Sequence, residues 1–165
     1  GCGGGLVIDG LLQVGANGIG GEWGHNPLAA PRADEVPGPP CYCGRNGCNE
    51  VWLSGTGVAR DHYETTGQTL TAIEIAAQET PEARASIERL ADRLARALGA
   101  VINLVDPDVI VLGGGLSNIA ALYTRVPELW AGYIFSDVIN TRLVANKHGD
   151  ASGVRGAAWL WPARH

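Results

Sequence analysis

The sequence predicts an α/β fold, because segments of helical and of extended character alternate along its 165 residues. Three observations support this prediction. Apolar residues recur at spacings of three and four over 81–105, which is typical of a long amphipathic helix. The continuous apolar run 109–112 comes next, and three glycines follow it at once, before another helical segment. A strand, a glycine turn and a helix in this order are typical of α/β proteins.

A hairpin is expected near the start of the chain. The apolar runs 6–8 and 11–12 flank Asp9-Gly10, a pair that favours a two-residue turn. Asp9 is therefore interpreted as a turn residue rather than as a catalytic carboxylate. The glycine-rich segment 14–21 is expected to be a loop.

Several short helices are expected between residues 49 and 79. The first covers 49–53, the glycines of 54–57 break it, and 58–63 is helical again, ending near Gly67. Thr71 and Glu74 match a capping box, which opens a helix reaching about residue 79. Thr80 should cap the long helix, with Pro81 at its first position.

The long helix 81–105 is expected to have one buried and one solvated face. The apolar stripe consists of Ile87, Leu90, Ala91, Leu94, Leu98, Val101, Ile102 and Val105. Charged side chains lie off this stripe, namely Glu88, Arg89, Asp92, Arg93 and Arg96. A charged face of this kind is normally exposed to solvent. Asp106-Pro107 should end the helix.

The last third continues the alternation. The strand 109–112 should be covered on both faces, because it is apolar throughout. One or two helices are expected over 119–135, broken at Pro127. A short strand over 142–145 precedes a final helix that runs through 156–158, with Asp150 or Ser152 as its cap.

Composition and charge exclude several classes of protein. Apolar residues make up 45% of the chain, which predicts a folded rather than a disordered protein. No apolar run reaches the roughly 18 residues that a membrane span needs, and no signal peptide is recognised at the start. The net charge of −5 argues against a nucleic-acid-binding surface. Cysteines at metal-ligand spacing favour a reducing, cytoplasmic setting.

Three of the four cysteines fall within eight residues, at Cys41, Cys43 and Cys48. The first two are too close in sequence for a relaxed disulfide. Glycines at 44 and 47 let the backbone fold back, so the three sulfurs can converge. With His25, the nearest upstream histidine, they would complete a closed tetrahedral zinc site. The alternative is three buried or redox-active thiols with an unrelated histidine.

Two carboxylates flank these ligands. Glu22 and Glu50 could each accept hydrogen bonds from adjacent hydroxyls of a sugar. Glu22 could instead be a surface or capping charge, and Glu50 a first-turn helix residue favoured by the helix dipole.

Two glycine clusters are candidate phosphate- or nucleotide-binding loops. Backbone amides of Gly3, Gly4 and Gly5 could form an anion-binding nest, or these residues could be a flexible terminus. The cluster Gly113, Gly114 and Gly115 follows a strand, where backbone can approach a nucleotide closely, but close packing of a helix on a strand also requires glycine.

Taken together, GEWGH at 21–25, CYCGRNGCNE at 41–50 and SGTG at 54–57 resemble the motifs of the ROK family (repressors, open reading frames and kinases). The resemblance is strongest to bacterial fructokinase-like sugar kinases. It extends from Gly1 to about Trp161 and includes GCGGG at 1–5, IVLGGGLS at 110–117 and GVRGAAWL at 153–160. It implies one lobe of the actin-like (ribonuclease H-like) ATPase fold with a zinc-knuckle loop.

The resemblance also implies a function. It indicates ATP-dependent phosphorylation of a hexose at the 6-hydroxyl, with Mg²⁺ as cofactor, and GEWGHNPL with PCYCG favours fructose. The family pattern assigns Glu22, His25 and Glu50 to the sugar and His25, Cys41, Cys43 and Cys48 to structural zinc. It assigns the glycines of 3–5 and 113–115 to ATP.

The organisation follows from the same resemblance. Residues 1–165 are expected to be the C-terminal lobe of such a kinase, with 21–50 as its sugar- and zinc-binding segment. A chain without Met that opens on a glycine loop is interpreted as a fragment. The family's catalytic aspartate would lie on an N-terminal lobe, so this chain alone is expected to be inactive. A homodimer is also implied.

Two other functions were weighed. A sugar-sensing ROK repressor would share these motifs and carry a helix-turn-helix upstream, although the GCGGG loop favours a kinase. A zinc-knuckle nucleic-acid binder is disfavoured, because Arg32 and Arg45 near the cysteines are outnumbered by Asp34, Glu35 and Glu50.

Overall fold

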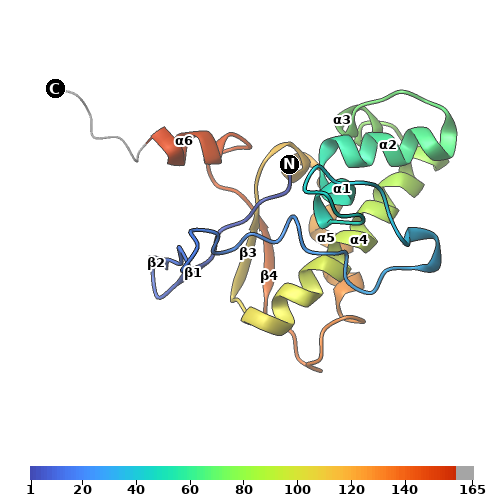
Figure 1. Ribbon diagram of the computed structural model, residues 1–165. Helices are drawn as coiled ribbons and strands as arrows, with labels where there is room; N and C mark the ends of the chain where they lie inside the picture. Colours follow the sequence, from blue (N-terminus) through green and yellow to red (C-terminus); the bar gives the residue numbers. More distant parts are fainter. Residues whose placement is uncertain (159–165) are drawn as a thin grey trace.

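Two short sheets and six α-helices make up the computed structural model, which describes residues 1–158 (Figure 1). The helices are α1 (Asn49–Leu53), α2 (Gly55–Thr66), α3 (Ala72–Ala76), α4 (Pro81–Val105), α5 (Leu122–Trp130) and α6 (Ser152–Ala158). The strands are β1 (Val7–Ile8), β2 (Leu11–Leu12), β3 (Val109–Leu112) and β4 (Arg142–Ala145). Two 3₁₀ turns, η1 (Ala33–Glu35) and η2 (Gly115–Asn118), complete the described elements. The α/β prediction is confirmed.

Strands β3 and β4 pair in parallel, with Val109 opposite Arg142 and Leu112 opposite Ala145. Helices α1 to α5 gather beside this sheet, whereas α6 lies apart from them (Figure 1). Because the two strands run in parallel, the glycines after Leu112 and the residues after Ala145 meet at one edge. This is the edge at which α/β proteins bind ligands.

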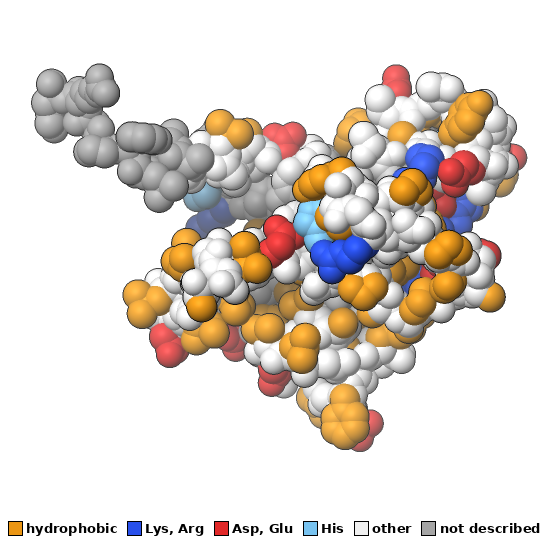
Figure 2. Space-filling model, viewed as in Figure 1, with side chains coloured by type: hydrophobic (Ala, Val, Ile, Leu, Met, Phe, Trp, Pro, Cys, Tyr) orange, Lys and Arg blue, Asp and Glu red, His pale blue; other side chains and the backbone are white. Residues whose placement is uncertain are grey.

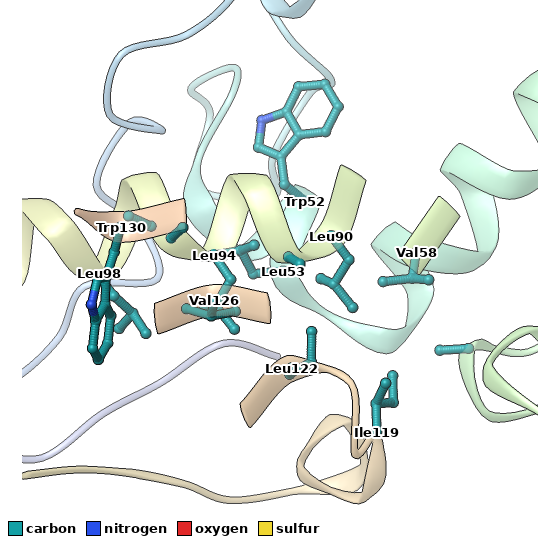
Figure 3. Packing of buried hydrophobic residues seen from close by; sticks show 14 of the residues in the cluster. Trp52, Leu53, Val58, Leu90, Leu94, Leu98, Ile119, Leu122, Val126 and Trp130 are labelled. Atoms are coloured by element: carbon teal, nitrogen blue, oxygen red, sulfur yellow. The ribbon is translucent and has the colours of Figure 1, made fainter. Parts of the chain in front are cut away.

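The core is built around α4, with side chains of α5 and of α1 to α3 packed into the same cluster. Leu90, Leu94 and Leu98 of α4 are buried, and Figure 3 shows them beside side chains of α5. Those α5 residues, Leu122, Val126 and Trp130, are almost completely buried. The stripe that repeats every three to four residues in the sequence is therefore the face that packs, as its periodicity predicts.

The helix boundaries follow the capping residues. The hydroxyl of Thr71 accepts a hydrogen bond from the Glu74 amide at 3.2 Å, and that of Thr80 accepts from Ala83 at 3.2 Å. Both caps and the capping box at Thr71 were predicted, although α3 ends at Ala76 rather than near residue 79. Helix α2 starts at Gly55, earlier than predicted, because the Ser54 hydroxyl accepts from the Gly57 amide and caps it.

The hairpin β1–β2 is also confirmed. Asp9 and Gly10 both adopt positive φ, 52° and 76°, as a two-residue turn requires. The four apolar side chains of its strands remain exposed, and Figure 2 shows hydrophobic side chains at the surface there. Segment 14–21 forms a loop, as predicted.

Three predictions about this architecture are wrong. The most consequential concerns the charged face of α4: Arg96 is 1% exposed and Asp92 and Arg93 are also buried, whereas Glu88 is exposed as predicted and Arg89 is half-buried. The three buried side chains are not solvated because the segment 30–35 and helix α2 cover them and supply opposite charges.

The other two errors are local. Strand β3 is covered on one face only, since Val109 and Val111 are exposed while Ile110 and Leu112 are half-buried. Pro127 lies inside α5 instead of breaking it. Val126 and Trp130, on either side of this proline, are anchored in the core, and this packing keeps the segment helical.

The final helix begins at Ser152, within the segment 150–152 expected to open it, so Ser152 is its first residue rather than its cap. Trp159 to Trp161 of the family resemblance lie outside the described residues. Within 1–158, none of the helices combines the length and the apolar character needed to cross a membrane.

Candidate metal centre

The four predicted metal ligands come together in the structure. The ligand atoms of His25, Cys41, Cys43 and Cys48 all lie within 4.8 Å of one another. Cys43 Sγ is 3.6 Å from Cys48 Sγ, and Cys41 Sγ is 3.5 Å from His25 Nδ1. Tetrahedral zinc with Zn–S bonds of about 2.3 Å separates its sulfur ligands by roughly 3.8 Å. The donor set and its spacing therefore fit Zn²⁺.

The backbone explains why ligands so far apart in sequence meet. The Cys41 amide donates a hydrogen bond to the Arg45 carbonyl at 2.8 Å, and the Gly44 amide donates one to the Cys41 carbonyl at 3.0 Å. Gly44 has a φ of 86°, which lets the chain reverse between the second and third sulfurs. The Leu28 amide donates to the Gly47 carbonyl at 3.0 Å, which places the strand after His25 beside Cys48.

The thiols differ in their affinity for protons. Hydrogen bonds from Arg45 lower the pKa of Cys43 from 9.0 to about 6. Burial and hydrogen bonds with Cys43 and Cys41 together raise the pKa of Cys48 to about 12. A thiolate is the metal-binding form of cysteine. Cys43 would therefore offer an anionic ligand at neutral pH, whereas at Cys48 a cation would have to displace the proton.

The two candidate sugar carboxylates lie beside the start of the chain. Glu50 Oε2 accepts a hydrogen bond from the Cys2 amide at 3.0 Å. Glu22 Oε1 accepts from the Gly24 amide at 3.0 Å. Burial and, to a smaller extent, the charges of Glu50 and Glu22 raise the pKa of Cys2 to about 11.

The histidine carries a partner that sequence reasoning missed. His25 Nε2, the nitrogen expected to face a sugar hydroxyl, lies 2.7 Å from the Tyr42 hydroxyl. The two rings meet edge to face, with their centroids 4.9 Å apart. The position of Tyr42 between two metal-binding cysteines is the one feature of the sequence that could have indicated this contact.

A cavity of about 300 Å³ opens beside Glu50 and is lined by Gly1, Ser54, Thr56 and Arg60 among others. This volume is at the lower end of the range for small-molecule pockets. A larger cavity of about 570 Å³ lies at the other end of the sheet, between Asp106 and Phe135. Since its lining includes none of the predicted site residues, the smaller cavity is the relevant one.

The two glycine clusters occupy different places. Gly3 accepts a hydrogen bond from the Trp23 indole at 3.0 Å, so the 3–5 segment lies against the GEWGH motif. Gly113, Gly114 and Gly115 follow β3 at the carboxyl edge of the sheet. A Cβ added at any of these three would meet nothing within 4 Å, so tight helix–strand packing does not account for them. Gly114 has a φ of 71°, which itself favours glycine.

Known proteins resemble this chain in sequence and in structure. The ROK family pattern matches residues 1–164. An N-acetyl-D-glucosamine kinase of Escherichia coli O1:K1 / APEC is 40% identical over 167 residues, covering 97% of this chain and 55% of that protein. A similar kinase of Yersinia pseudotuberculosis serotype O:1b is 37% identical with the same coverage. The chain thus spans about half the length of the curated relatives it matches.

Solved structures of ROK family proteins have the same fold as this chain. A ROK family glucokinase from Streptomyces griseus, in complex with glucose and AMPPNP, superposes with a TM-score of 0.81 at 25% identity, covering 96% of this chain and 56% of that one. These relatives are named for N-acetylglucosamine and glucose, so fructose stays a prediction. The actin-like ATPase fold predicted for the chain is confirmed. By sequence pattern, sequence identity and fold, the chain belongs to the ROK family.

Proposed function

We propose that this protein is an ATP-dependent sugar kinase that phosphorylates the 6-hydroxyl of a hexose, and that residues 1–165 supply its sugar- and ATP-binding C-terminal lobe. One observation carries the proposal. Glu50 contacts the Cys2 amide and lines a cavity of about 300 Å³, and Trp23, between Glu22 and His25 in the sequence, donates a hydrogen bond to the Gly3 carbonyl. Sugar-binding groups and a phosphate-binding backbone are thereby close enough to serve one reaction.

The sugar is bound by acceptors and one donor. Carboxylates accept hydrogen bonds from hydroxyls strongly, because the acceptor is charged. Glu22 and Glu50 each have one oxygen engaged by a backbone amide, of Gly24 and Cys2, which fixes the orientation of the carboxylate. In the tautomer that binds a metal through Nδ1, His25 carries its hydrogen on Nε2 and donates it to a sugar hydroxyl.

Zinc has a structural role in this proposal. His25, Cys41, Cys43 and Cys48 would hold it, and four protein ligands leave no position for a reactive water. When bound, zinc supplies the cross-link that keeps His25 oriented. The residues themselves do the rest: the knuckle 41–48 leads directly into α1, which carries Glu50.

Phosphoryl transfer requires positioning of the nucleotide and neutralisation of charge, for which kinases use Mg²⁺. The backbone of Gly3, Gly4 and Gly5 would contact the ATP phosphates, and that of Gly113, Gly114 and Gly115 the adenosine. The base that accepts the proton of the sugar hydroxyl is expected on an N-terminal lobe. Residues 1–165 alone are accordingly proposed to be inactive, and a homodimer is proposed for the complete protein.

The sequence motifs and the known relatives point to different sugars. The motifs of this chain favour fructose, whereas the relatives are named kinases of N-acetyl-D-glucosamine. ADP release should be measured with the intact protein, ATP, Mg²⁺ and each of fructose, mannose, glucose, N-acetylglucosamine and N-acetylmannosamine. Turnover on one hexose supports the kinase and identifies the substrate. Turnover on N-acetylglucosamine alone would overturn fructose but not the kinase.

A second function is a sugar-sensing repressor. A ROK family transcriptional regulator, a homologue of the E. coli MLC protein, superposes with a TM-score of 0.72 at 27% identity, over 92% of this chain and 41% of that one. The identity to named kinases reaches 40%, which favours the enzyme. Sugar binding without ADP release, together with an upstream helix-turn-helix, would support the repressor instead.

A further inference from the structure

The polar face of α4 carries a buried network of charges. Glu35 accepts from Arg96 at both oxygens, at 2.7 and 2.8 Å, and from Arg93 Nε at 2.8 Å. Asp92 accepts from Arg96 at 3.1 Å and from Arg32 at 2.9 Å. Glu35 is 5% exposed and Arg96 1%. The network ties the segment between His25 and Cys41 to the longest helix of the fold.

Arg93 joins this segment to the two helices that follow the metal knuckle. Its guanidinium donates to Glu35 of η1 and, at 2.6 Å, to Asp61 of α2. It also lies 4.3 Å from the centroid of the Trp52 ring in α1. Helix α1 begins directly after Cys48 and carries Glu50. One side chain thus contacts both the segment between His25 and Cys41 and the two helices that follow Cys48.

The connection from Glu35 to the knuckle is short. A Cβ on Gly38 would lie 2.7 Å from Gly47 Cα and 3.1 Å from the Glu35 carbonyl, so backbone packs on backbone here. The Gly47 amide donates to the Pro39 carbonyl at 2.9 Å. A shift of Glu35 would therefore be transmitted through Gly38 to the residue preceding Cys48.

The charges favour a role beyond stability. Burial works to raise the pKa of Glu35, yet hydrogen bonds from Arg96, the Arg32 amide and Arg93 outweigh it and lower the pKa to about 2. Glu35 is therefore ionised at neutral pH, in a network whose other members are also charged. Apolar side chains of similar size often stabilise such a site equally well, so a buried ionic network is better explained by the geometry that it imposes.

We propose that Glu35 and Arg93 are positioning residues, which hold His25, the cysteine knuckle and Glu50 in register before a metal or a sugar binds. This inference rests on the proposed function. Its chemistry is that of an outer support for metal ligands: the network does not touch the cation, but it limits the distance that the four ligand atoms can move apart. Groups that hydrogen-bond directly to metal ligands commonly change metal affinity by about 10- to 100-fold, and a support one layer further out should act in the same direction.

The test compares two variants of the intact protein. Glu35→Gln keeps the shape of the side chain and removes its charge. Leu98→Ala removes core volume on the apolar stripe of α4 and changes none of the hydrogen bonds of the network, so it serves as a control for lost stability. Zinc affinity is measured by competition with a chromophoric chelator, and ligand geometry from the absorption of the cobalt-substituted protein.

We expect Glu35→Gln to bind zinc about 10-fold more weakly or worse. Its cobalt spectrum should be altered, and its sugar KM should rise more than its kcat falls. Leu98→Ala should lower thermal stability but leave zinc affinity and the cobalt spectrum unchanged. If Glu35→Gln does not fold, Arg93→Lys replaces it, since lysine keeps the charge but cannot reach Glu35 and Asp61 together.

Results that would contradict the positioning role can be told apart from results that would contradict the proposed function. Equal zinc affinity and an unchanged cobalt spectrum in the parent and Glu35→Gln would overturn the positioning role, and so would an equal loss of affinity in Leu98→Ala. If the parent binds no zinc, the metal site of the proposed function fails first, which is a separate result.

Discussion

The Nε2 atom of His25 lies 2.7 Å from the hydroxyl oxygen of Tyr42, so a tyrosine occupies the position that a sugar hydroxyl would take on this histidine. Nε2 has a single hydrogen to donate when Nδ1 binds a metal. The Tyr42 side chain is otherwise free to move away, since the residue is 83% exposed. If the sugar binds His25 as proposed, its hydroxyl would have to displace the Tyr42 hydroxyl to gain this hydrogen bond.

Tyr42→Phe should consequently strengthen sugar binding. The variant removes the competing hydroxyl, and one hydrogen bond of this kind is worth about 1 kcal/mol, or roughly fivefold in affinity. Calorimetric titration with the sugar measures the change. Tyr63→Phe, the same alteration at an exposed residue of α2, is the matched control and should bind as the parent does. Weaker binding by Tyr42→Phe would instead show that the tyrosine orients His25 for the sugar.

The cluster can be tested by its metal content. Cys48→Ser should abolish stoichiometric zinc, because serine is a poor ligand for this cation. Cys2→Ser is the matched control: Cys2 contacts Glu50 through its backbone and is not one of the four cluster residues. Metal analysis of both purified proteins decides the matter. Equal zinc in the two variants would show that the cluster is not the metal site.

The charge network predicts a dependence of stability on pH. The pKa of Glu35 is lowered from 4.5 to about 2, so the folded state binds this proton less readily than the unfolded state does. The stabilisation, roughly 3 kcal/mol, is present above pH 4.5 and disappears as the pH falls toward 2. Denaturant unfolding of the metal-free protein, with chelator present, should show this loss.

In Glu35→Gln the same titration should be flatter between pH 4.5 and 2, because the group that gains the proton is gone. Glu79→Gln alters a carboxylate that is 94% exposed and should retain the slope of the parent. Identical pH profiles for the parent and Glu35→Gln would contradict the ionised, buried state of this residue.

The glycine loop after β3 offers another test. Gly114→Ala introduces a Cβ where φ is 71°, which costs about 1 kcal/mol of folding free energy. It should also raise the KM for ATP, because the backbone of this loop is proposed to contact the adenosine. Gly113→Ala is the control, since a Cβ there meets open space and φ is not positive. An unchanged KM for ATP in Gly114→Ala would remove this loop from the nucleotide site.

The parts of the fold that could be predicted from sequence are those decided locally. The hairpin depends on the Asp9-Gly10 turn, and the starts of α3 and α4 depend on the caps Thr71 and Thr80. The apolar stripe of α4 depends only on the spacing of its own residues. The metal cluster was predictable for a similar reason, because three of its ligands lie within one short turn. Glycines at 44 and 47 indicate how that turn reverses.

The parts that could not be predicted depend on distant partners. Arg96 and Glu35 are separated by 61 positions, and a charged helix face is solvated unless a specific segment covers it. Nothing in the local pattern of α4 distinguishes the two cases. Pro127 is similar: a proline normally ends a helix, and only the burial of Val126 and Trp130 keeps α5 continuous.

The most direct test of the central claim, that Glu22, His25 and Glu50 form the sugar site of a kinase, is the hexose-dependent release of ADP by three forms of the intact protein. These are the parent, Glu50→Gln and the exposed control Glu79→Gln. We predict that kcat/KM for the preferred hexose falls by 100-fold or more in Glu50→Gln, roughly the effect of losing a charge-assisted hydrogen bond of about 3 kcal/mol, and is unchanged in the control. Equal activity of the parent and Glu50→Gln would contradict the account.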